Sequence, residues 1–142
     1  MVLIDVNVLV YAHRAELPDH DRFHEWLDAC VESDQAFGIA DVVLSGFLRI
    51  VTHPRIMKPP TPLEQALQAV EKLRGRPNCV VIAPGPRHWE IFTRLCRVAG
   101  VKGNLIPDAY LAGLAIESGS EWITTDRDFS RFPGLRWRHP LD

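Results

Sequence analysis

Cysteine, lysine and long hydrophobic runs are scarce in this 142-residue sequence. The three cysteines, Cys30, Cys79 and Cys96, are odd in number, widely separated and outside any metal-ligand spacing, so we expect reduced thiols rather than disulfides or a zinc centre. No apolar run approaches the ~20 residues that cross a bilayer, and the first residues do not combine a basic leader with an apolar segment. These absences predict a cytoplasmic protein with no membrane partner.

The basic residues are strongly biased towards arginine. Only Lys58, Lys72 and Lys102 are lysines, so 13 of the 16 basic residues are arginine. The net charge of −2 argues against a simple nucleic-acid coat protein, although arginine forms the better fork for phosphate oxygens. Because arginine is also common in surface ion pairs, the bias alone does not decide between RNA binding and ordinary solvated charge.

Short apolar runs alternate with helical patterns along the chain. With 46% hydrophobic residues, we expect a single domain over residues 1–142 with a sizeable core. Strands are predicted at residues 2–4, 36–40, 79–83 and 121–125, with a short last strand at 135–137. Helices are predicted between the strands, including residues 42–52 and 108–118. This alternation is typical of an α/β domain with a mainly parallel sheet.

Capping residues predict where several helices begin and end. Thr61, with Glu64 three residues later, forms a capping box and predicts a helix start. Asp41 is the expected cap of the helix over residues 42–52. Gly100 and Gly119 are expected to end the helices that precede them.

Acidic residues stand at the ends of predicted elements in three separate places. Asp5 follows the first strand, Asp108 lies in the first turn of an apolar helix, and two more acids, Asp126 and Asp128, follow the fourth strand. Each acid alone is explained as a helix cap or as a partner of the helix dipole. Because the carboxyl ends of parallel strands meet at one edge, we expect the four acids to lie close together. Their mutual repulsion there favours a hard divalent cation.

Three segments carry a resemblance to a known family. Residues 4–11 (IDVNVLVY), 107–112 (PDAYLA) and 124–129 (TTDRDF) resemble the three acidic motifs of PIN-domain ribonucleases. More narrowly, the chain resembles the VapC-type toxins of toxin–antitoxin pairs over its whole length, in motif order and spacing. The resemblance implies a PIN-like three-layer α/β sandwich, with a central, mainly parallel sheet of four or five strands flanked by helices.

The resemblance also implies an activity, a cofactor and partners. It implies a Mg²⁺-dependent endoribonuclease, with Mn²⁺ as an alternative metal, that cleaves structured RNA of the tRNA or rRNA class. Carried over by position, Asp5 and Asp108 are the expected metal ligands. Asp126 and Asp128 complete the catalytic set through water or a second metal. In this mechanism the metal orients and acidifies a water and offsets charge on the phosphate. The enzyme is expected to be a homodimer that a cognate antitoxin inhibits.

One position departs from the family pattern. The family commonly places a glutamate in the third helix, where this chain has Gly46. Asp41 is five residues earlier and, at ~100° per residue, lies on another face of the helix. Glu117 is nine residues after Asp108 and faces away from it by the same arithmetic. We therefore expect no substitute for that glutamate, which bears on a second metal and on activity but not on the fold.

A negative site that receives RNA needs a positive rim. Arg49 and His53 share one helical face, and Arg55 follows shortly after. Together with Arg14, and with Asn104 in the loop before the second acidic motif, they are the predicted RNA-binding residues. Ordinary solvated charge explains each of them equally well.

Two other functions fit parts of the sequence. A haloacid-dehalogenase-like phosphotransferase would use Asp5 as nucleophile and Lys102 to neutralise charge. That family needs a second aspartate where this chain has Asn7. A catalytically weak or inactive PIN domain, which binds RNA or a partner protein without cutting, is suggested by Gly46. Cleavage of structured RNA with and without Asp5→Asn separates the three functions.

Overall fold

A five-stranded parallel sheet forms the centre of the computed structural model, which describes residues 1–142. The strands are β1 (Val2–Ile4), β2 (Phe37–Ala40), β3 (Cys79–Ile82), β4 (Glu121–Ile123) and β5 (Trp137–Arg138). They lie in the order β3-β2-β1-β4-β5, and every neighbouring pair is parallel. The predicted α/β fold with a mainly parallel sheet is therefore confirmed.

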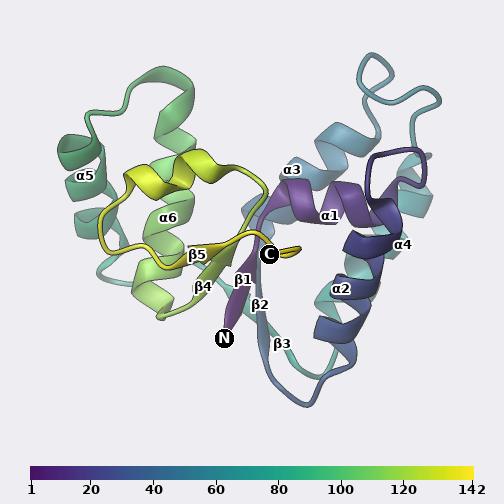
Figure 1. Cartoon of the computed structure of the whole chain (residues 1–142), viewed down its shortest axis with the longest axis horizontal. Coiled ribbons are helices and arrows are strands. Elements are labelled where there is room, and N and C mark those ends of the chain that lie inside the picture. The colour runs from purple at the N-terminus through teal and green to yellow at the C-terminus, as the bar shows by residue number, and fades with distance from the viewer.

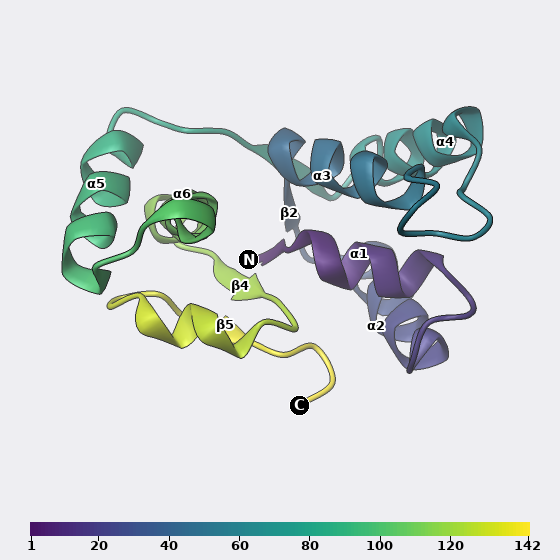
Figure 2. The ribbon, with the colours of Figure 1, turned by 90° about the horizontal axis from the view of Figure 1, so that it is seen from above.

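Helices cover both faces of the sheet. They are α1 (Val6–His13), α2 (His20–Glu32), α3 (Asp41–Val51), α4 (Leu63–Arg74), α5 (His88–Ala99) and α6 (Ile106–Ser118), with short 3₁₀ helices η1 (Gly103–Leu105) and η2 (Arg127–Arg131). Figures 1 and 2 show α1 to α4 on one side of the sheet and α5 and α6 on the other, which confirms the three-layer arrangement. None of the helices is both long and apolar enough to span a bilayer.

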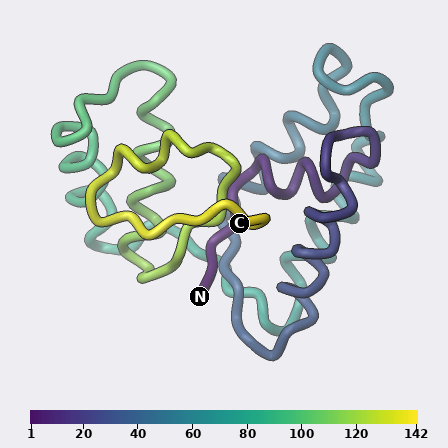
Figure 3. Tube along the Cα trace, viewed as in Figure 1, coloured from purple at the N-terminus to yellow at the C-terminus, as the bar shows by residue number.

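β1 is the innermost strand because the chain changes direction around it. From β1 the chain runs outward to β2 and β3, then returns through α5 and α6 to add β4 on the opposite side of β1 (Figure 3). Leu3 and Ile4 are fully buried, as expected for a strand covered on both faces. In open parallel sheets, ligands bind in the crevice beyond such a switch point. The residues that follow β1 and β4 therefore occupy the position where this fold class binds ligands.

α6 packs between α5 and the sheet and is rich in small residues (Figure 2). Ala109, Ala112 and Ala115 are fully buried, as the apolar pattern of this segment predicts. Gly113 faces α5, where a Cβ atom would lie only 3.1 Å from Nε2 of His88. The close packing holds the first turn of α6, with the second acidic motif, at the edge of the sheet.

Glycines end α5 and α6 as predicted. Gly100 and Gly119 follow these helices with φ angles of 63° and 67°. This left-handed conformation is strained for residues that carry a Cβ atom. The two helix ends can therefore be read from the sequence.

Two predicted helix caps are wrong. α4 begins after Pro62, and the hydroxyl of Thr61 accepts a hydrogen bond from Nη1 of Arg14 at 3.1 Å instead of capping the helix. Asp41 is the first residue of α3 rather than its cap. Its carboxylate accepts hydrogen bonds from Nε and Nη2 of Arg74 at 2.8 and 3.2 Å. Both side chains are drawn away from the helix ends by arginines that are distant in the sequence.

Candidate active site

Asp5 lies at the junction of β1 and α1 and is only 5% exposed. Oδ1 accepts a hydrogen bond from the backbone N–H of Val6 at 2.7 Å, so the carboxylate caps α1. Oδ2 accepts one from Oγ1 of Thr124 at 2.7 Å and one from Nδ2 of Asn7 at 3.1 Å. No ion pair in the structure involves Asp5. Its burial is compensated by hydrogen bonds alone.

The negative charge of Asp5 is unfavourable in this position. Burial raises the pKa of the Asp5 carboxyl from 3.8 to about 6. Hydrogen bonds from Thr124, Val6 and Asn7 lower this pKa, while the carboxylate of Asp108 raises it further. A bound cation would stabilise a carboxylate that is buried, repelled by its neighbour and without a positive partner.

Thr124 and Asn7 join the chain segments that leave the two central strands. The fully buried hydroxyl of Thr124 donates to Asp5 and accepts a hydrogen bond from the backbone N–H of Asp126 at 3.0 Å. Oδ1 of Asn7 accepts a hydrogen bond from the backbone N–H of Thr125 at 3.1 Å. The segment after β4 is thereby fixed against the segment after β1.

The third acidic motif forms a tight turn at the start of η2. Oδ1 of Asp126 accepts a hydrogen bond from the backbone N–H of Asp128 at 2.9 Å and caps η2. Arg131, the last residue of η2, folds back onto this turn. Its Nε donates to the backbone carbonyl of Asp128 at 3.0 Å, and its Nη2 lies 3.6 Å from Oδ2 of Asp128. The turn thus carries both acidic and basic side chains at the edge of the sheet.

Asp108 is partly buried in the first turn of α6. Burial raises the pKa of its carboxyl, and the nearby charge of Asp126 raises it further. The guanidinium of Arg131 lowers this pKa, and the carboxylate of Asp128 raises it. The carboxylate of Asp108 in turn raises the pKa of Asp5. Asp108 therefore lies within electrostatic reach of the other three predicted acids.

The donor set fits a hard divalent cation that keeps most of its water ligands. Mg²⁺ usually binds one or two carboxylates together with retained waters, and Asp5 and Asp108 supply such oxygens. No three histidine, cysteine, aspartate or glutamate side chains converge on a point that could hold a metal. The buried Asp5 carboxylate, which has no cationic partner, therefore fits an open magnesium site with few protein ligands, and not a closed structural site.

Gly46 lies against Val6, the first residue of α1, which directly follows Asp5. A Cβ atom at Gly46 would lie 3.0 Å from Cγ2 of Val6. The position where the family commonly has a glutamate therefore faces this edge of the sheet, but an apolar side chain fills the adjacent space. Asp41 is paired with an arginine of α4, and Glu117 accepts two backbone N–H groups ahead of α5, so neither takes the place of that glutamate.

Arg14 lies beyond the last residue of α1, at the opposite end of this helix from the acidic site. Its side chain is 12% exposed and fully engaged. Nε donates to Glu16 at 2.7 Å, Nη1 to the hydroxyl of Thr61 at 3.1 Å and Nη2 to the carbonyl of Pro59 at 2.8 Å. Arg14 thus holds the loop between α3 and α4, and its contact with RNA stays a prediction.

The other predicted RNA-binding residues are more accessible. Arg49, Arg55 and Asn104 are exposed, and their side chains make no hydrogen bond within the protein. His53 is partly buried, and its Nδ1 accepts a hydrogen bond from the backbone N–H of Arg55 at 3.1 Å. These four side chains come from the end of α3, the loop after it and η1. Their role in binding RNA stays a prediction.

Three residues of the site, Asn7, Thr124 and Arg131, lie outside the predicted set. Asn7 belongs to the first acidic motif, directly after Asp5 and Val6. Thr124 belongs to the third acidic motif, and a polar residue at the end of an otherwise apolar strand was the available signal. Arg131 has no such signal, because its effect on Asp108 arises between segments that only the fold brings together.

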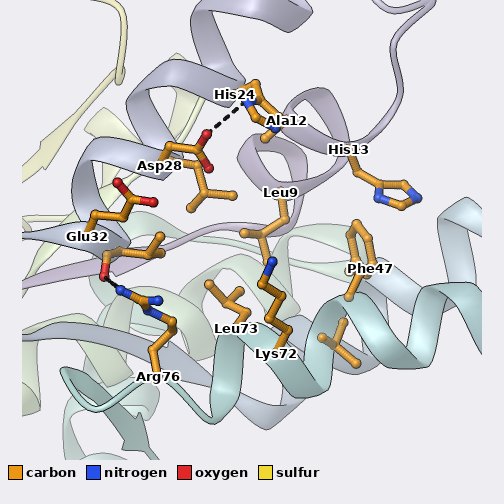
Figure 4. A pocket seen from close by; sticks show the side chains of 14 residues that line it. Leu9, Ala12, His13, His24, Asp28, Glu32, Phe47, Lys72, Leu73 and Arg76 are labelled. Atoms are coloured by element: carbon orange, nitrogen blue, oxygen red, sulfur yellow. Dashed lines mark hydrogen bonds and ion pairs between the residues drawn. The ribbon is translucent and has the colours of Figure 1, made fainter.

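A groove of about 300 Å³ lies between α1, α2, α3 and α4 (Figure 4). Its apolar lining residues are Leu9, Ala12, Leu27, Val31, Phe47, Ala69, Val70 and Leu73. Charged side chains on α2, α4 and just beyond also line it, namely Asp28, Glu32, Lys72 and Arg76. Leu9 is one helical turn after Asp5, so α1 connects the groove with the acidic site.

The model of the PIN domain family matches residues 2–135 of the chain. The VapC ribonuclease Mb2897 of Mycobacterium bovis is 45% identical over 142 residues, which cover 100% of this chain and 97% of the relative. A toxin–antitoxin complex from Klebsiella pneumoniae contains a chain with a TM-score of 0.65 at 17% identity, over 99% of this chain and 98% of that chain. Mycobacterium tuberculosis VapC20, described as a sarcin–ricin loop cleaving toxin, has a TM-score of 0.66 at 13% identity, over 96% and 99% of the two chains. The chain therefore belongs to the PIN domain family, among its VapC ribonucleases.

Proposed function

We propose that this protein is a Mg²⁺-dependent endoribonuclease toxin that cleaves structured RNA of the tRNA or rRNA class. The observation that carries the proposal is the buried Asp5 carboxylate, which lies at the switch point of the sheet, repels Asp108 and has no cationic partner. The relationship to a named VapC ribonuclease supports a nuclease. The likeness to a toxin that cleaves the sarcin–ricin loop supports a structured RNA substrate.

Asp5 and Asp108 would hold the cation, either Mg²⁺ or Mn²⁺. When bound, such an ion supplies Lewis-acid charge that acidifies water and offsets the charge of a phosphate. Hydrogen bonds to both oxygens of Asp5 fix the orientation of this carboxylate. Asp126 caps η2 through Oδ1, which leaves Oδ2 able to accept a hydrogen bond from a water molecule. A phosphotransferase with Asp5 as its nucleophile fits less well, because Asn7 stands where that family needs a second aspartate.

The RNA backbone needs positive and donor groups around these acids. We propose that the exposed side chains of Arg49, Arg55 and Asn104, together with His53, bind RNA phosphates. Each arginine that neutralises a phosphate should contribute about one counterion to the salt dependence of binding. Arg49→Gln should therefore weaken RNA binding and reduce the slope of log K against log salt by ~1, and an unchanged slope would exclude a phosphate contact.

Cleavage of a structured RNA tests the proposed activity. The wild type should cut in Mg²⁺ and lose activity in chelator, and Asp5→Asn should have no detectable activity. Asp21→Asn is the matched control, because Asp21 is an exposed carboxylate of α2 without an ion pair or side-chain hydrogen bond. This variant should cut like the wild type. Cleavage that persists in chelator or in Asp5→Asn would overturn the proposal.

We also propose that a cognate antitoxin occupies the groove and the acidic site together. The apolar floor and charged rim of the groove suit the apolar face of an amphipathic helix. Because Leu9 lies ~6 Å along α1 from Asp5, a short extended segment can continue from the groove to the acids. An arginine in that segment would pair with Asp5 and Asp108 through charge-assisted bonds and exclude a cation. The likeness to a chain of a toxin–antitoxin complex supports such a partner.

Co-purification with the product of the adjacent reading frame tests the antitoxin proposal. Ala69→Glu places a charge in the apolar lining of the groove and should release the partner while RNA cleavage continues. Leu63→Glu is the control on the same helix, because Leu63 is 60% exposed and does not line the groove. A partner that binds both variants equally, or that leaves cleavage by the wild type unaffected, would count against this proposal.

Gly46 favours a second candidate function, a PIN domain that binds RNA or a partner protein without cutting. The site lacks the additional acid that the family commonly has there, because residue 46 is glycine and Val6 fills the space beside it. Under this alternative the protein binds structured RNA in Mg²⁺ but cuts it no faster than Asp5→Asn does. The same cleavage assay therefore distinguishes the two candidates.

A further inference from the structure

The 3₁₀ helix η2 carries two arginines that contact different partners. Nη1 and Nη2 of Arg127 donate to the two carboxylate oxygens of Asp142, the last residue of the sequence, at 3.3 and 3.1 Å. Arg131 instead donates from Nε to the backbone carbonyl of Asp128 at 3.0 Å. The first arginine is engaged by the C-terminal segment, and the second by the acidic motif.

Arg131 is the arginine whose charge acts on the acidic site. Its Nε donates to the backbone carbonyl of Asp128 and its Nη2 lies 3.6 Å from Oδ2 of Asp128, so its guanidinium lies against the third acidic motif. The positive charge of this guanidinium also lowers the pKa of Asp108. The guanidinium of Arg127 is instead paired with the carboxylate of Asp142. The edge of the sheet thus combines four carboxylates with one guanidinium.

The guanidinium of Arg131 retains most of its hydrogen-bond donors. Arginine carries five N–H groups, and only the one on Nε makes a hydrogen bond here. The 3.6 Å distance from Nη2 to Oδ2 of Asp128 is too long for a hydrogen bond. The hydrogen bond from Nε and the nearby carboxylate of Asp128 restrain the Arg131 side chain, which is 30% exposed. The N–H groups of Nη1 and Nη2 are therefore restrained in direction yet accessible.

We propose that Arg131 is a catalytic residue that binds the non-bridging oxygens of the scissile phosphodiester. This inference rests on the proposed ribonuclease function. In the reaction a water oxygen bonds to phosphorus, one bond from phosphorus to an ester oxygen breaks, the water gives up a proton and the leaving oxygen takes one up. Negative charge on the non-bridging oxygens is stabilised by two N–H groups of Arg131. The same contact places the phosphate beside carboxylates that would otherwise repel it.

Two substitutions in the same short helix test the proposal. Arg131→Gln and Arg127→Gln each remove one positive charge from η2, so net charge cannot explain a difference between them. Arg131→Gln should lower kcat for a structured RNA by about 100-fold, the usual loss for one donor to a developing oxyanion. Arg127→Gln should leave kcat unchanged. Arg131→Lys should restore only part of the rate, because an ammonium group lacks the fork of donors.

Binding measurements separate contact with phosphate from support of η2. In chelator, where no turnover occurs, Arg131→Gln should bind the RNA more weakly than Arg127→Gln does. Mg²⁺ should bind Arg131→Gln at least as tightly as the wild type, because a neighbouring positive charge has been removed. A residue that only supports η2 would instead lower the melting temperature and Mg²⁺ affinity together, and that result would overturn the proposal.

The outcome also distinguishes this inference from the activity on which it rests. If Asp5→Asn is inactive while Arg131→Gln keeps the kcat of Arg127→Gln, Arg131 is not catalytic and the ribonuclease function stands. If Asp5→Asn retains full activity, the proposed function itself fails. Should Arg131→Gln not fold, Arg131→Lys keeps the charge, and its kcat should fall at an unchanged melting temperature. An undiminished kcat in a folded Arg131→Lys would overturn the proposal.

Discussion

The burial of Asp5 predicts how stability depends on pH in the absence of metal. The ordinary pKa of the carboxyl is 3.8, and burial raises it to about 6 in the folded protein. Between these two values the folded protein binds the proton more tightly than the unfolded chain, so stability falls as the pH rises through this window. The two pKa values differ by about 2, which corresponds to ~3 kcal/mol of unfolding free energy lost above pH 6.

Asp5→Asn removes this unfavourable charge. The asparagine carbonyl can still accept the hydrogen bond from the backbone N–H of Val6. Its NH₂ group cannot accept the bond that Asn7 donates at 3.1 Å, and the bond from Thr124 must rearrange. These losses cost ~1–2 kcal/mol against the ~3 kcal/mol gained. In chelator at pH 8 we therefore expect the variant to be more stable by ~1–2 kcal/mol, which is ~0.5–1 M in the urea midpoint.

Urea unfolding at pH 8 and pH 5 in chelator measures this effect. At pH 5 the folded wild type is largely protonated at Asp5, so the advantage of Asp5→Asn should shrink by ~1.4 kcal/mol. Asp21→Asn should match the wild type at both pH values. An Asp5→Asn variant that is less stable than the wild type by the same margin at both pH values would refute the reasoning. Asp5 would then be only a helix cap, worth ~0.5–2 kcal/mol.

The remaining predictions concern catalysis, metal binding, the role of Arg14 and assembly. Asp5→Asn and Asp108→Asn should each abolish cleavage in single-turnover assays, with the double variant little worse; a loss of only a few-fold from either would end the idea of a shared metal. Millimolar Mg²⁺ should raise the melting temperature of the wild type more than that of Asp108→Asn, whereas equal shifts would leave Asp108 as a partner of the helix dipole alone. Arg14→Ala should lose ~1–2 kcal/mol of stability in urea with an unchanged KM for RNA, because it releases Thr61 and the carbonyl of Pro59; a raised KM at unchanged stability would place Arg14 in the RNA contact instead. Sedimentation should give a homodimer, and a monomer at micromolar concentration would count against this expectation.

The strands and the acidic motifs could be predicted from the sequence because both depend on local patterns. A continuous apolar run such as Leu3 and Ile4 indicates a buried strand, and an acid directly after it marks the strand's end. Parallel topology then brings Asp5 and Asp126 to the same edge without further information. Asp5 caps α1 and is also within electrostatic reach of Asp108, so its role as a helix cap does not exclude the proposed role in a metal site.

Contacts between distant segments could not be predicted in this way. The pattern around Thr61 is typical of a helix cap, but Arg14 competes for the hydroxyl from 47 positions away. Thr124 reaches Asp5 across 119 positions. The charge of Arg131 acts on a different helix. Such contacts depend on how whole helices and strands pack against one another, so the local pattern of residues does not predict them.

The central claim is that the buried Asp5 carboxylate belongs to a cation site that is required for RNA cleavage. The most direct test titrates Mg²⁺ calorimetrically into the wild type, Asp5→Asn and Asp21→Asn, and measures cleavage of a structured RNA on the same samples. The wild type and Asp21→Asn should bind Mg²⁺ and cut over the same range of metal concentration, while Asp5→Asn should do neither. Equal Mg²⁺ binding by Asp5→Asn, or cleavage by the wild type without metal, would contradict the claim.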